Sequence, residues 1–310
     1  MTLVSTTVAR RRARGATVAV AALGTAVALL LSGCTTPSTA PAPHRIQLVA
    51  STNVYGGVAR AIAGNLIDIN SIIDNSTDDP HTFEGGARVQ LALSKADIII
   101  ENGAGYDSFM DTLIAGLPDS KAKVLNVADI SKKTVDADFN EHLWYDFPTM
   151  EKLAAELVST LSALSPGNAG AFQNNASAFV VELAGLEGRE DALKAKYAGD
   201  GIAITESVPG YMLQASGLRV VTPKKFTQAV QAGTDVAPAV LQEALGQLSD
   251  GSAQILIYNS QTTGPQTDAM RQAARVAGVP VMSVTENLPP GFTYLQWMTG
   301  NLTLLRSTLP

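Results

Sequence analysis

Cysteine and histidine are both scarce in this chain, which has one cysteine and three histidines among 310 residues. The single cysteine, Cys34, excludes an intramolecular disulfide, so the core must stabilise the folded state. Basic residues are also in the minority, and the 22 Lys and Arg against 28 Asp and Glu argue against a nucleic-acid-binding protein. A hydrophobic fraction of 46% excludes a disordered chain, and the length is sufficient for two domains of typical size.

The first 34 residues differ in composition from the rest of the chain. An apolar run over 16–31 follows a basic segment that contains Arg10, Arg11, Arg12 and Arg14. One interpretation is a transmembrane anchor, because the run approaches the ~20 apolar residues that a spanning helix requires. The other is a signal peptide, which has a basic start, an apolar run and small residues at its end.

The sequence LSGC that ends at Cys34 resembles the bacterial lipobox, in which the cysteine is lipidated and becomes the mature N-terminus. This resemblance favours a lipoprotein with a signal peptide over 1–33 and a flexible tether of Pro, Ser and Thr over 34–44. Removal of 1–33 takes away four of the 22 basic residues and leaves 18 against 28 acidic residues. We therefore predict an exported, acidic protein that is lipid-anchored to the outer face of the cell membrane.

Apolar runs and helical patterns alternate twice along the mature chain, which is typical of parallel βα units. Strands are predicted at 46–51, 66–73, 96–102 and 122–127, and again at 201–207, 218–223, 253–260 and 279–286. The residues over 149–198 have no strand pattern. There, an apolar face predicts a helix of about 30 residues, roughly 45 Å long. The predicted fold is therefore α/β, with two βα lobes over 45–148 and 199–310 that have parallel-type sheets and are joined by one long backbone helix.

Four residues fall in the loops that follow predicted strands. His81 and His142 belong to the first lobe, and Glu206 and Glu286 follow strands of the second lobe. In open α/β sheets ligands bind beyond the carboxyl ends of the strands, so these side chains would converge on the cleft as a site for a divalent cation. A loop histidine can equally be a hydrogen-bonded surface residue, and a carboxylate after a strand can cap the next helix. Spacing alone does not decide between these interpretations.

Several segments resemble the zinc- and manganese-binding solute-binding proteins of bacterial ABC importers. The segments are STNVYGGVARAIAGN (51–65), DPHTFEG (79–85), NEHLWYD (140–146), TESVPGYML around Glu206, and VTENLPPGFTYLQWM (284–298). The resemblance implies two lobes on a rigid backbone helix, with one transported Mn²⁺ or Zn²⁺ held at the lobe interface by His81, His142, Glu206 and Glu286. It also implies a monomer whose partners are a membrane permease and its cytoplasmic ATPase.

The chain departs from that family at two places. The family usually has Asp-Pro before its second histidine, whereas this chain has Asn140-Glu141, which leaves the loop less constrained. The fourth ligand of the family is commonly aspartate, so Asp235 is the reserve candidate for the role of Glu286.

Zinc-dedicated members often have a third histidine at the position of Glu206. A carboxylate there favours Mn²⁺ in physiology, although Zn²⁺ should bind at least as tightly in vitro.

Other classes of function also fit an anchored two-lobed protein. A metal-dependent hydrolase would need an open coordination position and a general base, and the sequence has no H-E-x-x-H motif. An adhesin, or a binding protein for an organic solute, would not require two histidines opposite two glutamates. We therefore predict a metal-capturing solute-binding protein that is not an enzyme, with a hydrolase or an adhesin as the alternatives.

Overall fold

The computed structural model describes residues 45–75, 78–117 and 121–310. The predicted signal peptide, the predicted lipidation site Cys34 and the predicted tether lie outside the described residues. Arg45 to Pro310 form one compact unit. Within the part of the chain that the structure describes, no helix is long and apolar enough to cross a membrane.

The first lobe is built on a four-stranded parallel sheet with the strand order β2-β1-β3-β4. Its strands are β1 (Gln47–Thr52), β2 (Asp68–Ile73), β3 (Ile98–Glu101) and β4 (Lys123–Asn126). Its helices are α1 (Asn53–Ala63), α2 (Ala87–Ser94), α3 (Ser108–Ala115) and α4 (Val127–Ser131). Ile98, Ile99 and Ile100 of β3 are fully buried, as expected for a strand that helices cover on both faces.

The second lobe repeats this arrangement with a four-stranded parallel sheet of order β6-β5-β7-β8. Its strands are β5 (Gly201–Ile204), β6 (Arg219–Val220), β7 (Ile255–Asn259) and β8 (Val281–Val284). Its helices are α7 (Gly210–Ala215), α8 (Lys224–Gln231), α9 (Pro238–Ser249), α10 (Pro265–Ala277) and α11 (Tyr294–Thr308). In each sheet the first strand in sequence lies between the second and the third, so the strand order reverses at this point. Ligands of doubly wound sheets bind beyond the strand ends at such a switch point.

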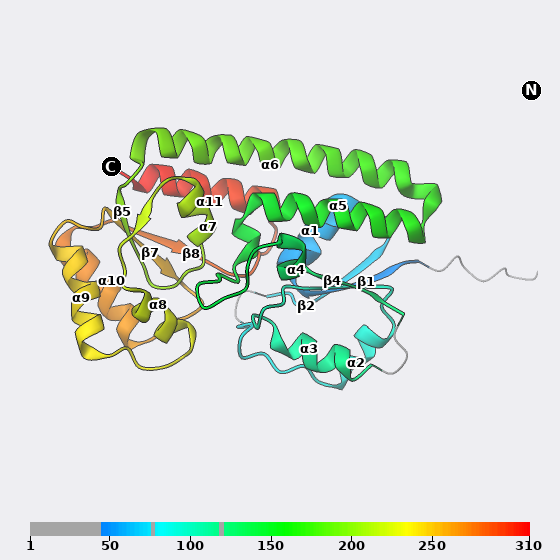
Figure 1. Ribbon diagram of the computed structural model, residues 1–310, viewed down its shortest axis with the longest axis horizontal. Helices are drawn as coiled ribbons and strands as arrows, with labels where there is room; N and C mark the ends of the chain where they lie inside the picture. The colour runs from blue at the N-terminus through cyan, green and yellow to red at the C-terminus, as the bar shows by residue number, and fades with distance from the viewer. Residues whose placement is uncertain (1–44, 76–77, 118–120) are drawn as a thin grey trace, which may run out of the picture. The chain divides into compact units, whose positions relative to one another are not determined.

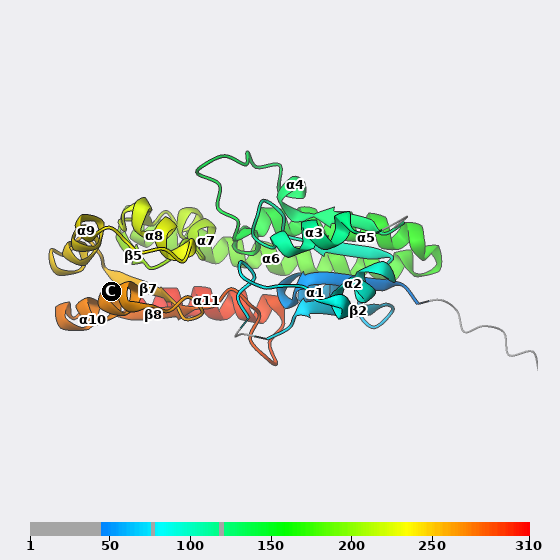
Figure 2. The same ribbon diagram turned by 90° about the horizontal axis from the view of Figure 1, so that it is seen from below.

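Two long helices join the sheets. After the short turn η1 (Leu143–Tyr145) come α5 (Phe147–Leu164), the turn η2 (Pro166–Asn168) and α6 (Ala169–Tyr197). Helix α6 has 29 residues, which is about 44 Å of helix. It packs on α1 of the first lobe and on α7 and α11 of the second, and Figures 1 and 2 show it running past both lobes. The predicted fold class, two parallel βα lobes with one long helix, is confirmed.

Glu190 occupies a position on α6 where the helical spacing calls for an apolar side chain. The buried residues of the helix follow steps of four and three: Phe172, Ala176, Phe179, Leu183, Leu186, Glu190, Leu193 and Tyr197. Glu190 is 5% exposed, and its Oε1 has no hydrogen-bond partner among the described residues. Burial first, and then the charges of Glu187, Asp146 and Asp191, raise the pKa of Glu190 to about 8. An ionised Glu190 therefore destabilises the fold.

Replacing Glu190 by glutamine should stabilise the protein at alkaline pH and leave its stability unchanged near pH 4. Below the ordinary pKa of 4.5 the carboxyl group is protonated in both the folded and unfolded states. Between 4.5 and about 8 only the unfolded state loses the proton, so the free energy of unfolding falls as pH rises. Because the group retains some water contact, we expect a gain of ~2 kcal/mol at pH 8. Urea unfolding at both pH values measures the gain, with the exposed Glu182→Gln on the same helix as the control. Equal effects of the two variants would contradict the prediction.

Candidate metal centre

The ends of the strands place two carboxylates of the second lobe side by side. Glu206 lies two residues after β5, and Glu286 lies two residues after β8. Between these strands runs β7, whose last residue is Asn259. Its Nδ2 donates hydrogen bonds to Glu206 Oε2 at 2.5 Å and to Glu286 Oε1 at 2.8 Å. One amide therefore holds both carboxylates at the same edge of the sheet.

The first lobe contributes His142, which directly precedes η1 and is fully buried. Its Nδ1 lies 2.7 Å from Asn140 Oδ1. The Asn140 amide is oriented by its own Nδ2, which donates to the carbonyl of Ser207 in the second lobe at 2.9 Å. Because the oxygen of Asn140 can only accept, Nδ1 of His142 carries the proton and Nε2 presents its lone pair. The imidazole is thus held in the tautomer that binds a metal through Nε2.

His81 lies in the loop between β2 and α2, and its side chain is 18% exposed. Its Nε2 is 4.0 Å from Glu286 Oε2, and Nε2 of His142 is 3.8 Å from the same oxygen. Tyr106 also donates its hydroxyl to this oxygen at 3.2 Å. One carboxylate of the second lobe therefore faces both imidazoles of the first.

The donor atoms that face one another fit a metal ion. Nε2 of His81, Nε2 of His142 and Oε1 of Glu206 are buried and have no hydrogen-bond partner among the described residues. Nitrogen and oxygen ligands bound at ~2.0–2.1 Å in a tetrahedral site lie roughly 3.4 Å apart. The nitrogen-to-oxygen distances of 3.8 and 4.0 Å are slightly longer, so small movements of the side chains would bring His81, His142 and Glu286 onto one ion. Asn259 holds Glu206 beside Glu286.

A positive charge would stabilise the buried carboxyl groups of this site. Burial, and then the charge of Glu206, raise the pKa of Glu286 to about 8. Burial also raises the pKa of Glu206, and it lowers the pKa of His142 well below its ordinary value. A neutral imidazole therefore lies beside two carboxyl groups that a dication would convert to carboxylates. This donor set of imidazoles and carboxylates suits Zn²⁺, Mn²⁺ and related ions.

Comparison with known protein families gives one match over most of the chain. Residues 48–308 match the family model described as zinc-uptake complex component A, periplasmic, or ZnuA. The chain belongs to the ZnuA family. ZnuA-family proteins are the extracytoplasmic metal-binding components of ABC importers. The family assignment therefore confirms the predicted class of function, including the prediction that the protein is not an enzyme, and does not favour a hydrolase or an adhesin.

The relatives of this ZnuA-family chain are named for different metals. The manganese-binding lipoprotein MntA of Bacillus subtilis (strain 168) is 21% identical over 256 residues, which cover 80% of this chain and 82% of MntA. The iron ABC transporter substrate-binding lipoprotein MtsA of Streptococcus pyogenes is 22% identical over 301 residues, or 88% of this chain and 92% of MtsA. The structure of the periplasmic zinc-binding protein TroA from Treponema pallidum aligns with a TM-score of 0.73 and 18% identity over 86% of this chain and 100% of TroA. At that identity the structural likeness establishes the fold.

The structure brings all four residues predicted as ligands to one place. The reserve candidate Asp235 lies elsewhere on the surface: it is exposed, and its Oδ1 accepts a hydrogen bond from Gln266 at 3.1 Å. It belongs to the loop before α9, which begins at Pro238. In this ZnuA-family chain, Glu286 is therefore the better candidate for the fourth ligand.

Three residues of the site were not among the predicted ligands. Asn259 and Tyr106 both bond to Glu286, and Glu141 lies close to His81. His81, Glu141 and His142 each offer one donor atom within 4.8 Å of the other two. The position of Asn259 at the end of a buried strand could have indicated it, because Glu206 and Glu286 were found by the same rule. The carboxylate of Glu141 had no such signal, since the residue before a ligand in a loop can point either way.

Proposed function

We propose that His81, His142, Glu206 and Glu286 bind one divalent transition metal, which the protein delivers to the permease of an ABC importer driven by a cytoplasmic ATPase. The observation that carries this proposal is the set of buried, unpartnered donor atoms around Glu286. Family membership supports the class of cargo. The two imidazoles belong to one lobe and the two carboxylates to the other, so binding would hold the lobes together.

The organisation around this site completes the proposal. Residues 45–148 and 199–310 would form the two lobes of a monomer, with 149–198 as the helical connection. Residues 1–33 would be removed on export, and lipid on Cys34 would anchor the protein to the outer face of the cell membrane. The names of MntA and MtsA as lipoproteins support such an anchor.

Metal titration of the protein purified from cells that express the full chain tests the proposal directly. After removal of metal with a chelator, isothermal calorimetry with Mn²⁺ and with Zn²⁺ should each give one ion per chain. Binding of neither ion, or of several ions with equal weak affinity, would contradict it.

The choice of metal should depend on Glu206. We propose that its carboxylate favours Mn²⁺, because harder oxygen ligands suit Mn²⁺ relative to a site richer in nitrogen. Glu206→His should therefore lower the affinity for Mn²⁺ at least ~10-fold more than the affinity for Zn²⁺. Competition titrations with both metals measure the ratio, and Glu206→Asp, which keeps the carboxylate, is the control. An unchanged ratio in Glu206→His would mean that another residue sets the preference.

The membrane anchor should depend on Cys34, because its thiol is the only cysteine thiol in the chain that a lipid could modify. Cys34→Ser should move the protein from the membrane fraction to the soluble fraction or leave it uncleaved. Cell fractionation with immunoblotting detects the change, and Ser32→Ala, which keeps the thiol, is the control. An unmodified Cys34 in the mass spectrum of the native protein would refute the anchor.

A further inference from the structure

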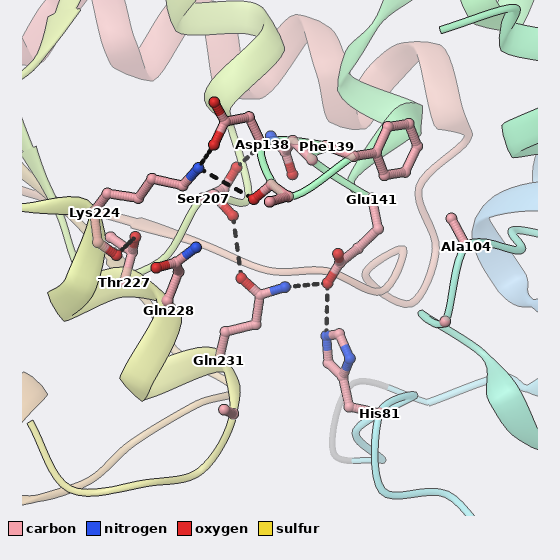
Figure 3. A pocket seen from close by; sticks show the side chains of 14 residues that line it. His81, Ala104, Asp138, Phe139, Glu141, Ser207, Lys224, Thr227, Gln228 and Gln231 are labelled. Carbon is pink, nitrogen blue, oxygen red and sulfur yellow. Dashed lines mark hydrogen bonds and ion pairs between the residues drawn. The ribbon is translucent and has the colours of Figure 1, made fainter. Parts of the chain in front are cut away.

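Glu141 directly precedes His142 in the chain, and its carboxylate faces His81. Glu141 Oε1 lies 3.5 Å from His81 Nε2, and the two side chains are 13% and 18% exposed. Figure 3 shows them pointing toward one another from two different loops of the first lobe. A glutamate at this place therefore adds a fifth ionisable group beside the four predicted ligands.

The free nitrogen of His81 lies between two carboxylates that differ in exposure. On one side is Glu141, from its own lobe, at 3.5 Å. On the other is Glu286, from the second lobe, at 4.0 Å, with a side chain that is 2% exposed. Together with the fully buried His142, whose Nε2 has no hydrogen-bond partner among the described residues, His81 and Glu141 form a second set of donors within 4.8 Å. All three of its members come from the first lobe.

A cavity of about 490 Å³ opens onto this second set. Its walls are the loop over 137–141 of the first lobe and residues of α8 in the second, and both His81 and Glu141 line it. Of the four predicted ligands, all of which are described, only His81 lines this cavity. An ion that arrives through the cavity would therefore meet Glu141 and His81 first, and His142 would be the third donor of this set before the ion reaches Glu206 and Glu286.

We propose that Glu141, His81 and His142 form an entry site, at which the metal ion binds before it moves to Glu206 and Glu286. The inference rests on the proposed function. A hydrated dication loses its water stepwise, and a carboxylate that is still partly exposed can replace the first water molecules at lower cost than fully buried groups can. The negative charge also raises the local concentration of cations in the cavity. His81 would bind the ion at both positions, because its Nε2 lies between the carboxylates of Glu141 and Glu286.

Gln231 of α8 supplies the partner to which Glu141 would return after transfer. Its Nε2 donates a hydrogen bond to Glu141 Oε1, the same oxygen that faces His81. Because Gln231 belongs to the second lobe, this bond forms only when the lobes are together. The neutral amide satisfies the carboxylate without competing for the ion, so Glu141 is left as a transient ligand.

An entry ligand should change the rates of binding and release more than it changes the affinity. In stopped-flow mixing of metal-free protein with Mn²⁺ or Zn²⁺, Glu141→Gln should slow association at least ~10-fold. Release into an excess of chelator should slow by a similar factor, so the equilibrium affinity should stay within about threefold. The protein is purified from cells that express the full chain, and urea unfolding confirms that the variant is folded.

The matched control is Glu84→Gln, which removes the same charge from an exposed position in the loop of His81. Its association rate should stay within about twofold of wild type. Equal rates for the two variants would overturn the entry site and leave the proposed function intact. A fall in affinity above ~10-fold with unchanged association would also overturn it, because Glu141 would then be a permanent ligand. Absence of metal binding by the wild-type protein would instead refute the proposed function itself.

Discussion

Replacing His142 by alanine should lower the affinity for Mn²⁺ and Zn²⁺ by at least about 1000-fold. Removal of a group that only orients a metal ligand already costs ~10–100-fold, and this change removes a ligand itself. The described residues offer no other imidazole in its place, because His81 is already part of the set. The loss should appear in calorimetry as the absence of the high-affinity phase.

His81→Ala should show a similar loss, because its Nε2 faces the same oxygen of Glu286. The matched control is His44→Ala, which removes the third histidine of the chain from the predicted tether. It should bind metal as the wild type does. Urea unfolding without metal distinguishes loss of a ligand from loss of the fold, since a folded variant keeps its cooperative transition. Wild-type affinity in both site variants would place the metal elsewhere.

The fold was predictable because strands and helices have hydrophobic periodicities that can be recognised in a single sequence. The isoleucines of β3 and the apolar face of α6 show the two periodicities that distinguish a buried strand from an amphipathic helix. The loops after parallel strands meet at one edge of a sheet, so the places of Glu206 and Glu286 followed from the strands alone. Strand β6 has two residues, fewer than the predicted run over 218–223, and both are exposed at the edge of the sheet.

The contacts between the lobes were not predictable in this way. Asn140 orients His142 on one side and reaches Ser207 on the other, and Gln231 meets Glu141 across the cleft. Such pairs join residues 67 and 90 positions apart, and they depend on how the two lobes pack. Periodicity carries no information about this packing. No strand or helix pattern predicts the approach of Glu141 to His81, whose Oε1 and Nε2 atoms, respectively, lie 3.5 Å apart in the structure.

At position 190 the hydrophobic periodicity of the sequence predicts a buried apolar side chain, whereas the chain has the carboxyl group of Glu190 there. Its position in the apolar face of α6 is as regular as that of Leu186 or Leu193. A buried carboxyl group at such a position weakens the fold at neutral pH, much as Glu286 does at the metal site. The two differ in what surrounds them. Glu286 lies beside unpartnered nitrogens that a cation would join to it, whereas the charges that act on Glu190 are other acids.

Replacing Glu286 by glutamine should weaken metal binding by at least about 100-fold and at the same time stabilise the metal-free protein. The amide keeps the shape of the side chain but removes an anionic oxygen that faces both imidazoles. Without metal, an ionised Glu286 destabilises the fold, because burial and the neighbouring Glu206 raise the pKa of Glu286 to about 8. A neutral group should therefore raise the free energy of unfolding at pH 8 and leave it unchanged near pH 4, where the carboxyl group is protonated in both the folded and unfolded states.

Asp235→Asn is the matched control, since it makes the same chemical change at the exposed reserve candidate. We expect it to leave metal affinity and stability unchanged, because its carboxylate bonds to Gln266 on the surface. Calorimetry gives the affinities, and urea unfolding in the presence of a chelator gives the stabilities. If the aspartate variant lost binding while Glu286→Gln kept it, Asp235 would be the fourth ligand. A loss of binding in Glu286→Gln with a less stable metal-free protein would mean that Glu286 supports the fold. Weaker binding together with a more stable metal-free protein is the combination expected of a ligand, because only the ion makes its burial favourable.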